Sequence, residues 1–165
     1  MREKNIAIIS TLDTKGPEAA FVKSRIEAAG YGVVLLDTGI LDRRDPSTPI
    51  PDVSADEIAR EGGEDRPALA ARSTEKETRN RGIRAMSKGS AKVLKQLYDA
   101  GRIRGVIGLG GAQGTEICTY AMRALPLGVP KVMVSTVASG QTPFGIYTGT
   151  RDLTIMHSVA DILGL

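Results

Sequence analysis

Four short apolar runs recur along the chain, and each is followed by a polar or glycine-rich turn. The strands predicted from these runs cover residues 6–9, 33–36, 103–109 and 131–135. Continuous apolar runs of this length are typical of strands covered on both faces, as in parallel sheets. Because helical patterns separate the runs, we predict a doubly wound α/β fold, Rossmann-like or flavodoxin-like, with a mostly parallel sheet.

The helical segments have recognisable starts and ends. Pro17 and Glu18 suit a first helical turn, and Gly30 suits a helix end. Thr115 is placed to cap the helix that follows the third strand. A short fifth strand is expected at 146–148. We expect helices at 17–29, 73–100, 115–125 and 152–163.

Residues 40–72 interrupt this alternation with prolines, glycines and clustered charges. Within them, Ser54 is placed as the N-cap of two helical turns, and Glu57 completes a capping box. We read the stretch as an irregular excursion from the sheet. Such an insertion forms a lid, a binding loop or a partner surface, or is simply mobile.

Length and composition narrow the class of protein. A chain of 165 residues suits one domain, and the single cysteine, Cys118, rules out an internal disulfide. A net charge of +3, with 4% aromatic residues and no tryptophan, argues against nucleic acid as a partner. No apolar run reaches the roughly 18 residues of a membrane span. We therefore expect a cytoplasmic protein without a membrane partner.

The segment GVIGLGGAQGT, residues 105–115, joins a strand to a helix through closely spaced glycines. It departs from the dinucleotide pattern because residue 113 is Gln113, and it is not a P-loop because no lysine follows the last glycine. What remains, Gly110, Gly111, Gly114 and Thr115, suits a phosphate or carboxylate held by backbone N–H groups. The alternative is that the glycines only permit a tight turn and close packing.

Three other strand ends are polar. Asp13, Thr14 and Lys15 follow the first strand, a turn ending in Gly39 follows the second, and Ser139 and Gly140 follow the fourth. Parallel strands bring these loops to one edge of the sheet, where ligands bind. Lys15 can pair a phosphate, and Asp13 can hold a ribose hydroxyl or Mg²⁺. The alternative is a capped helix start with a solvated lysine.

No residue set identifies a catalytic centre. The chain lacks the G-x-S-x-G elbow and any His/Cys spacing for a metal. The one histidine, His157, is expected on a helix surface or at an interface. Cys118 lies near a helix N-terminus, which lowers a thiol pKa, but a buried packing role is the preferred interpretation. The basic residues along 72–95 alternate with glutamates as on a solvated face, with phosphate or RNA contact as the alternative.

Several motifs together resemble one family. They are IISTLDTKG at 8–16, DTG at 37–39, GLGGAQGT at 108–115, PKVMVSTVASG at 130–140 and the ending at 152–159. The chain is similar over nearly its whole length to the ATP-binding family named after the tomato mosaic virus resistance protein, an uncharacterised family in bacteria. In the plant member this domain blocks viral RNA replication by binding the viral replication protein.

The resemblance implies an N-terminal subdomain of a two-subdomain α/β protein of about twice this length. It also implies ATP at the glycine loop, with or without Mg²⁺, and a homodimer. Three hypotheses follow: a nucleotide-binding domain, an enzyme for a phosphorylated or carboxylated small molecule, and a non-catalytic dimerisation or partner-binding domain that uses the excursion and the last helix.

Overall fold

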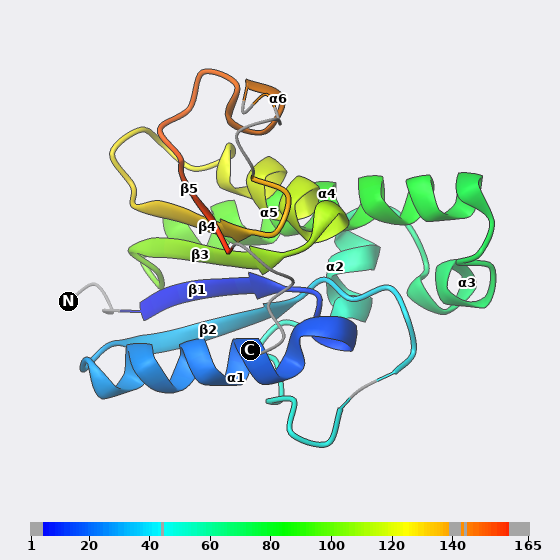
Figure 1. Ribbon diagram of the computed structural model, residues 1–165, viewed down its shortest axis with the longest axis horizontal. Helices are drawn as coiled ribbons and strands as arrows, with labels where there is room; N and C mark the ends of the chain where they lie inside the picture. Colours follow the sequence, from blue (N-terminus) through cyan, green and yellow to red (C-terminus); the bar gives the residue numbers. More distant parts are fainter. Residues whose placement is uncertain (1–4, 44, 139–142, 144, 159–165) are drawn as a thin grey trace.

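A computed structural model describes residues 5–43, 45–138, 143 and 145–158 of the chain. Within these residues, parallel strands form one sheet in the order β2-β1-β3-β4-β5 (Figure 1). This confirms the predicted doubly wound α/β fold. The strands are β1 (Asn5–Ser10), β2 (Gly32–Asp37), β3 (Gly105–Gly110), β4 (Lys131–Ser135) and β5 (Thr154–His157).

Helices cover both faces of the sheet. On one face α1 packs against β1, β2 and β3, and on the other face lie α2, α4 and α5. None of the described helices is both long and apolar enough to cross a membrane. The helices are α1 (Leu12–Ala28), α2 (Ala55–Glu61), α3 (Arg66–Ala71), α4 (Lys76–Asp99), α5 (Ala112–Met122) and α6 (Gly145–Thr148).

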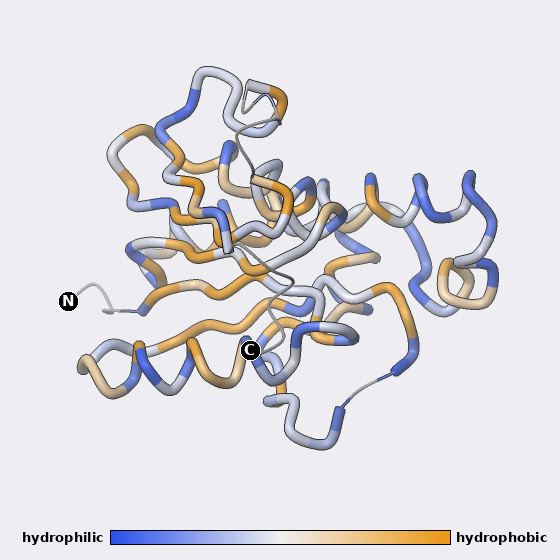
Figure 2. The backbone as a smooth tube through the Cα atoms, in the orientation of Figure 1, coloured by the Kyte–Doolittle hydropathy of each residue, from blue (hydrophilic) through white to orange (hydrophobic). Residues whose placement is uncertain are grey.

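The central strands are buried on both sides because their residues alternate between two apolar clusters. Ile8 and Leu35 face α1, whereas Ala7 and Leu36 face the larger cluster beneath α4 and α5. Figure 2 shows the resulting concentration of apolar residues along β1 and β2. Near-continuous apolar runs are what a parallel sheet with two covered faces requires, so this part of the prediction is confirmed.

The order of the strands creates a crevice at the carboxyl ends of β1 and β3, between the loops that follow them. Ile8 lies between Leu35 of β2 and Ile107 of β3, so β1 pairs with a strand on each side. After β1 the chain crosses to β2 on one side, whereas β3 continues to β4 on the other side. The loops that leave these two strands therefore separate, which is where open α/β sheets bind ligands.

The end of the chain differs from its predicted structure. Residues 154–157 form β5 rather than a helix, with Ile155 opposite Met133 and His157 opposite Ser135 of β4. Ile155 packs against the core while Met156 is exposed, as expected when successive side chains of a strand point to opposite faces. The predicted helix surface for His157 is therefore wrong. Residues 159–163 of that predicted helix lie outside the described part of the chain.

Three further boundaries are corrected. The segment predicted as a fifth strand is the helix α6, which lies against α5. Helix α1 begins at Leu12, five residues before the predicted start, and is kinked at Lys15, ahead of Pro17. The helix α5 begins at Ala112, with Gly111 rather than Thr115 in the N-cap position. The last two corrections bring the glycine loop and the first βα loop closer to their helices than the sequence predicts.

The excursion is anchored to both the sheet and α4. Val53 forms an isolated bridge with Leu36 of β2, and α2 then packs on α4. Ser54 caps α2 as predicted, because its Oγ accepts the backbone N–H of Glu57 at 3.2 Å. In Figure 1, α3 and the first turns of α4 lie beyond the carboxyl ends of the strands. The excursion thus forms a wall next to the edge where ligands bind.

A buried lysine connects β4 to the loop before β5. The Lys131 side chain is inaccessible to solvent, and its Nζ donates to Asp152 Oδ1 at 2.7 Å and to the carbonyls of Pro126 and Val129. The hydrogen bonds from Lys131 and from the backbone N–H of Gly128 lower the pKa of Asp152 from 3.8 to about 2. The ionised carboxylate therefore stabilises the fold.

We expect Asp152→Asn to lower the melting temperature at pH 7, because Lys131 stays buried without a carboxylate partner. A carboxyl whose pKa is depressed by folding contributes stability above its unfolded pKa, and the contribution is lost as pH falls through the folded pKa. The difference between the two proteins should therefore shrink between pH 4 and pH 2, about the range the two pKa values set. Melting curves by circular dichroism test this, and parallel curves at all pH values would contradict it.

Candidate functional site

A cavity of about 560 Å³ lies where the loops after β1 and β3 separate. The loops after β1, β2 and β3 contribute to its lining, as do the N-terminal ends of α1 and α5 and the segment before α4. Its volume is in the range of roughly 300–1,000 Å³ usual for small-molecule sites. The lining residues are Thr11, Asp13, Thr14, Lys15, Thr38, Ile40, Leu41, Arg43, Ser73, Thr74, Arg79, Gly111, Ala112, Gln113, Gly114 and Ile117.

The first loop brings all three of its predicted site residues to this cavity, in the first turn of α1. The Thr11 carbonyl accepts the backbone N–H groups of Thr14 and Lys15, which tightens the turn. Asp13 Oδ2 accepts the N–H of Leu41 at 2.9 Å, so this carboxylate also holds the start of the excursion. The three residues thus belong both to a helix start and to the cavity wall. The sequence had left these two positions open as alternatives.

Lys15 is buried although it is charged. Its Nζ lies 3.4 Å from Glu18 Oε1, and both side chains are almost fully covered. The predicted interpretation of a solvated lysine is therefore wrong. The other oxygen of this carboxylate, Glu18 Oε2, has no hydrogen-bond partner among the described residues. The Lys15–Glu18 pair neutralises much of the positive charge that the sequence placed here.

The glycines of the loop after β3 differ in the space around them. Gly110 ends β3, and a Cβ at this position would lie 2.6 Å from the Cα of Gly114, so no side chain fits. At Gly111 a Cβ would find only Thr136 Oγ1, at an ordinary 3.6 Å. At Gly110 the glycine is therefore required for close packing, which was the alternative interpretation of this loop. Gly111 and Gly114 line the cavity, at a helix N-terminus that has no side-chain cap.

That helix N-terminus is the main electrostatic feature of the loop. The first backbone N–H groups of any α-helix lack partners within the helix. The first turn of α5 includes Ala112, Gln113 and Gly114, all of which line the cavity. The partial positive charge of the helix end therefore faces a space large enough for a ligand. This arrangement suits an anion.

The remaining predicted site residues lie elsewhere. Thr115 is fully buried, and its hydroxyl is 2.7 Å from Ser135 Oγ, so it joins α5 to β4 in the interior. Gly39 packs against Asp13, whose Cγ would be 2.8 Å from a Cβ at this position. It supports the wall without lining the cavity. Ser139 and Gly140 lie outside the described residues.

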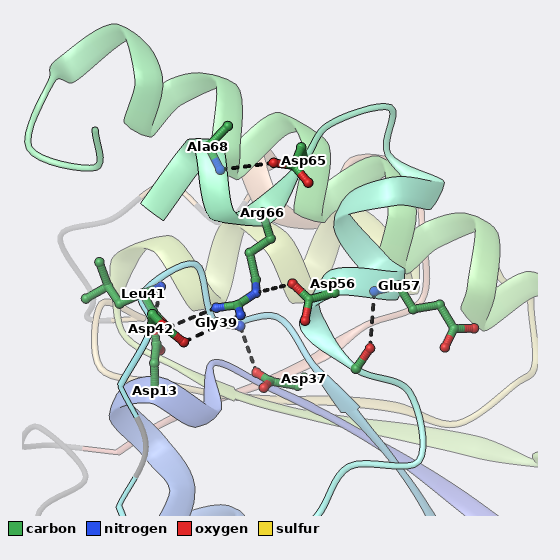
Figure 3. A network of polar contacts seen from close by, with 11 residues as sticks. Asp13, Asp37, Gly39, Leu41, Asp42, Asp56, Glu57, Asp65, Arg66 and Ala68 are labelled. Carbon is green, nitrogen blue, oxygen red and sulfur yellow. Dashed lines mark hydrogen bonds and ion pairs between the residues drawn. The ribbon is translucent and has the colours of Figure 1, made fainter. Parts of the chain in front are cut away.

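A polar network holds the excursion in place beside the cavity (Figure 3). Arg66 Nε donates to Asp56 Oδ1 at 2.6 Å, and the same guanidinium contacts Asp42 and the Leu41 carbonyl. At the end of β2, Asp37 Oδ1 accepts the N–H groups of Leu12 and Gly39. Because Leu41 also donates to Asp13, the loop after β1, the loop after β2 and α3 are linked.

Several lining residues were missed by the sequence prediction, and three of them carry polar groups that bear on the chemistry of the cavity. Thr38 lies within the turn that ends in Gly39, so its motif was identified but its side chain was not. Its hydroxyl is fully buried and finds no hydrogen-bond partner among the described residues. Arg43 and Arg79 come from the excursion and from α4. The excursion was interpreted as a lid, a binding loop, a partner surface or a mobile segment, and α4 as a solvated face with phosphate or RNA contact as the alternative. Only the folded chain brings these arginines to the glycine loop.

Other reactive groups are remote or absent. Cys118 is fully buried beneath the sheet, and loss of hydration raises its pKa to about 12. This confirms the packing interpretation and leaves the thiol protonated. Among the described residues there is no group of three or more His, Cys, Asp or Glu side chains that could hold a metal ion. The chemistry of the cavity therefore rests on N–H groups, hydroxyls, two arginines and the Lys15–Glu18 and Asp13 contacts.

The chain is similar in sequence to longer proteins. A UPF0261 protein of Clostridium tetani is 42% identical over 162 residues, which are 98% of this chain and 38% of that protein. A UPF0261 protein of Rhizobium meliloti is also 42% identical over 162 residues, or 37% of its length. The chain therefore spans well under half of these relatives, which is consistent with a further subdomain in them.

Similarity to the tomato ToMV resistance protein Tm-1(GCR237) is local. The two chains are 49% identical over 83 residues, which are 50% of this chain and 11% of the tomato protein. A much longer match covers residues 4–165 and corresponds to the N-terminal domain of an uncharacterised protein family. The chain belongs to that family, UPF0261, and corresponds to its N-terminal domain.

Proposed function

We propose that this domain binds a phosphorylated small molecule, with ATP as the first ligand to test. One observation supports the proposal above the others: the uncapped N-terminus of α5 faces a cavity of about 560 Å³ at the β1/β3 switch point. Backbone N–H groups and the helix dipole favour a phosphate at such a position. The apolar side chains of Ile40, Leu41 and Ile117 also line the cavity and suit the uncharged part of a ligand.

The Thr38 hydroxyl supports the same proposal independently. A buried hydroxyl without a partner costs free energy, roughly 1–3 kcal/mol. Proteins usually satisfy such groups, and an exception indicates a missing ligand, water or ion. Thr38 is among the residues that line the cavity, and a small shift of the wall on binding would let a phosphate or ribose oxygen accept its proton or a ligand hydroxyl donate to it.

Replacement of Thr38 by valine, which has nearly the same shape, tests this role. We expect Thr38→Val to raise the free energy of unfolding by about 1 kcal/mol, because an unpaired buried hydroxyl is removed. The same variant should bind ATP about tenfold more weakly, since the ligand loses a hydrogen bond. Isothermal titration calorimetry and urea unfolding measure the two effects.

Thr48 offers a matched control. Its hydroxyl is also buried and without a partner among the described residues, but it does not line the cavity. Thr48→Val should therefore stabilise the fold similarly and leave ATP affinity within about twofold of wild type. Equal effects of the two variants on binding would show that Thr38 does not touch the ligand. No calorimetric signal with ATP for the unmodified chain would refute ATP as the ligand.

A homodimer and contact with a C-terminal subdomain are proposals of a different kind. They come from the family resemblance and from the greater length of the relatives, of which this chain matches 38% in one case. Sedimentation of this chain measures whether it dimerises by itself. Sedimentation of a full-length relative measures whether dimerisation needs the rest of the protein. No enzymatic reaction is proposed, because Asp13 and Lys15, the carboxylate and the amine that line the cavity, both have partners within the wall.

A further inference from the structure

Four of the residues that line the cavity carry charge, and two of them are engaged within the protein. Lys15 pairs with Glu18, and the Asp13 carboxylate accepts the N–H of Leu41. The other two charged residues, Arg43 and Arg79, come from the excursion and the first turn of α4. The side-chain positive charge available to a ligand therefore lies on the part of the wall formed by these two segments. The glycine loop contributes none of it.

Neither arginine has a carboxylate partner within the described residues. Arg43 Nε donates to the main-chain carbonyl of Asp13 at 3.2 Å, which positions the side chain without neutralising it. Arg79 makes no side-chain hydrogen bond or ion pair with a described residue. Glu75 precedes Arg79 by one helical turn, but it pairs with Arg72 at 2.9 Å instead. Both guanidinium groups thus retain their capacity to bind an anion.

The other arginines around Arg79 differ in one respect or the other. Arg72 pairs with Glu75, and Arg81 pairs with Glu64 at 2.7 Å. Arg84 lies on the same helix, is exposed and has no ion-pair partner among the described residues, but it does not line the cavity. Arg84 is therefore a matched control for Arg79: the helix, exposure and lack of a partner are shared, and only the position at the cavity differs.

Two separate sources of positive potential thus face one cavity. The N-terminus of α5 is sufficient to hold one phosphate through backbone N–H groups. Two arginines from the excursion and α4, Arg43 and Arg79, line the same cavity and are in excess of that need, and arginine suits the oxygens of a further phosphate. We infer that Arg43 and Arg79 bind a second anionic group, so that the site prefers ligands with two or more phosphates over the corresponding monophosphate. This inference rests on the proposed function.

Calorimetric titration of the chain with ATP, ADP and AMP tests the inference. We expect AMP to bind at least about tenfold more weakly than ATP, because it lacks the group that the arginines hold. The variants Arg43→Gln and Arg79→Gln should each weaken ATP binding about tenfold and leave AMP affinity within about twofold. Arg84→Gln should change neither affinity. Inorganic tripolyphosphate, added as a competitor, reports whether the phosphates alone are recognised.

The outcomes separate this inference from the proposed function. If ATP and AMP bind with equal affinity, a phosphate site exists but the arginines do not bind a second phosphate. The same conclusion follows if Arg43→Gln and Arg79→Gln lower the affinities for ATP and AMP by the same factor. If none of the phosphates binds, both ideas fail. Because these arginines are exposed and lack carboxylate partners, their variants should retain the wild-type melting temperature. A large loss of stability would assign them a structural role instead.

Discussion

Gly89→Ala is expected to lower the free energy of unfolding by about 2–3 kcal/mol, because the added methyl group meets the backbone of α2. An ideal Cβ at this position would lie 1.9 Å from the carbonyl oxygen of Ile58 and 3.0 Å from the N–H nitrogen of Gly62. These atoms belong to the end of α2, which packs directly on α4. Since backbone cannot turn aside as a side chain does, the two helices must separate.

Gly82 provides the control on the same helix. Its Cβ would meet only the side chain of Ile40, with Cδ1 at 2.9 Å. The end of this side chain can rotate, and alanine is favoured over glycine inside a helix by about 1 kcal/mol. Gly82→Ala should therefore be neutral or slightly stabilising. Urea unfolding monitored by circular dichroism measures both variants, and equal effects would contradict close packing at Gly89.

The α2–α4 contact matters for the site as well as for stability. The excursion carries Arg43, and the ion pairs of Arg66 with Asp42 and Asp56 hold its segments together. Its position beside the cavity depends on α2 lying close to α4. We therefore expect Gly89→Ala to weaken ATP binding, although Gly89 does not line the cavity. Gly82→Ala is a control for stability alone, because its methyl group contacts Ile40, which lines the cavity.

The central sheet could be predicted from sequence because its signals are local. Residues 6–9 and 33–36 are continuous apolar runs, and each is followed by a polar turn. The last element could not be predicted in this way. Its four residues, 154–157, become a strand by pairing with β4, and a short apolar segment without that partner fits a helix equally well. Edge strands depend on a neighbour that the local pattern does not contain.

The candidate site was predictable only in part, for a related reason. Asp13 and Gly111 follow apolar strands directly, so a local pattern places them at the binding edge of a parallel sheet. Arg79 lies in a helix whose sequence resembles a solvated surface. Its place beside the cavity results from the path of the whole excursion, and no short motif encodes that path. Thr38 was within an identified motif, but its burial required the folded chain.

Gly111→Asp is expected to have opposite effects on stability and on ligand binding. Gly111 has the N-cap position of α5, with φ −77° and ψ −154° and no side-chain cap. A side chain fits there, since the nearest atom to a Cβ would be Thr136 Oγ1 at 3.6 Å. Aspartate is a preferred N-cap residue and its charge interacts favourably with the helix dipole, so we expect stability to rise by about 0.5 kcal/mol.

The same carboxylate would occupy the position that we propose for a phosphate. Two like charges about 4 Å apart repel by several kcal/mol near a protein surface, and the aspartate would also take the N–H groups of the first turn. ATP affinity should therefore fall by at least about 100-fold. Calorimetry measures the loss, and a thermal melt without ligand confirms that the fold is retained.

Gly111→Asn separates charge from capping. Asparagine has nearly the same shape, caps helices as well as aspartate does, and carries no charge. It should stabilise α5 and weaken ATP binding by about tenfold at most, since it competes for N–H groups without repelling the phosphate. A more stable Gly111→Asp variant that binds ATP as tightly as the unmodified chain would rule out the N-terminus of α5 as the phosphate site, whatever ligand the cavity takes.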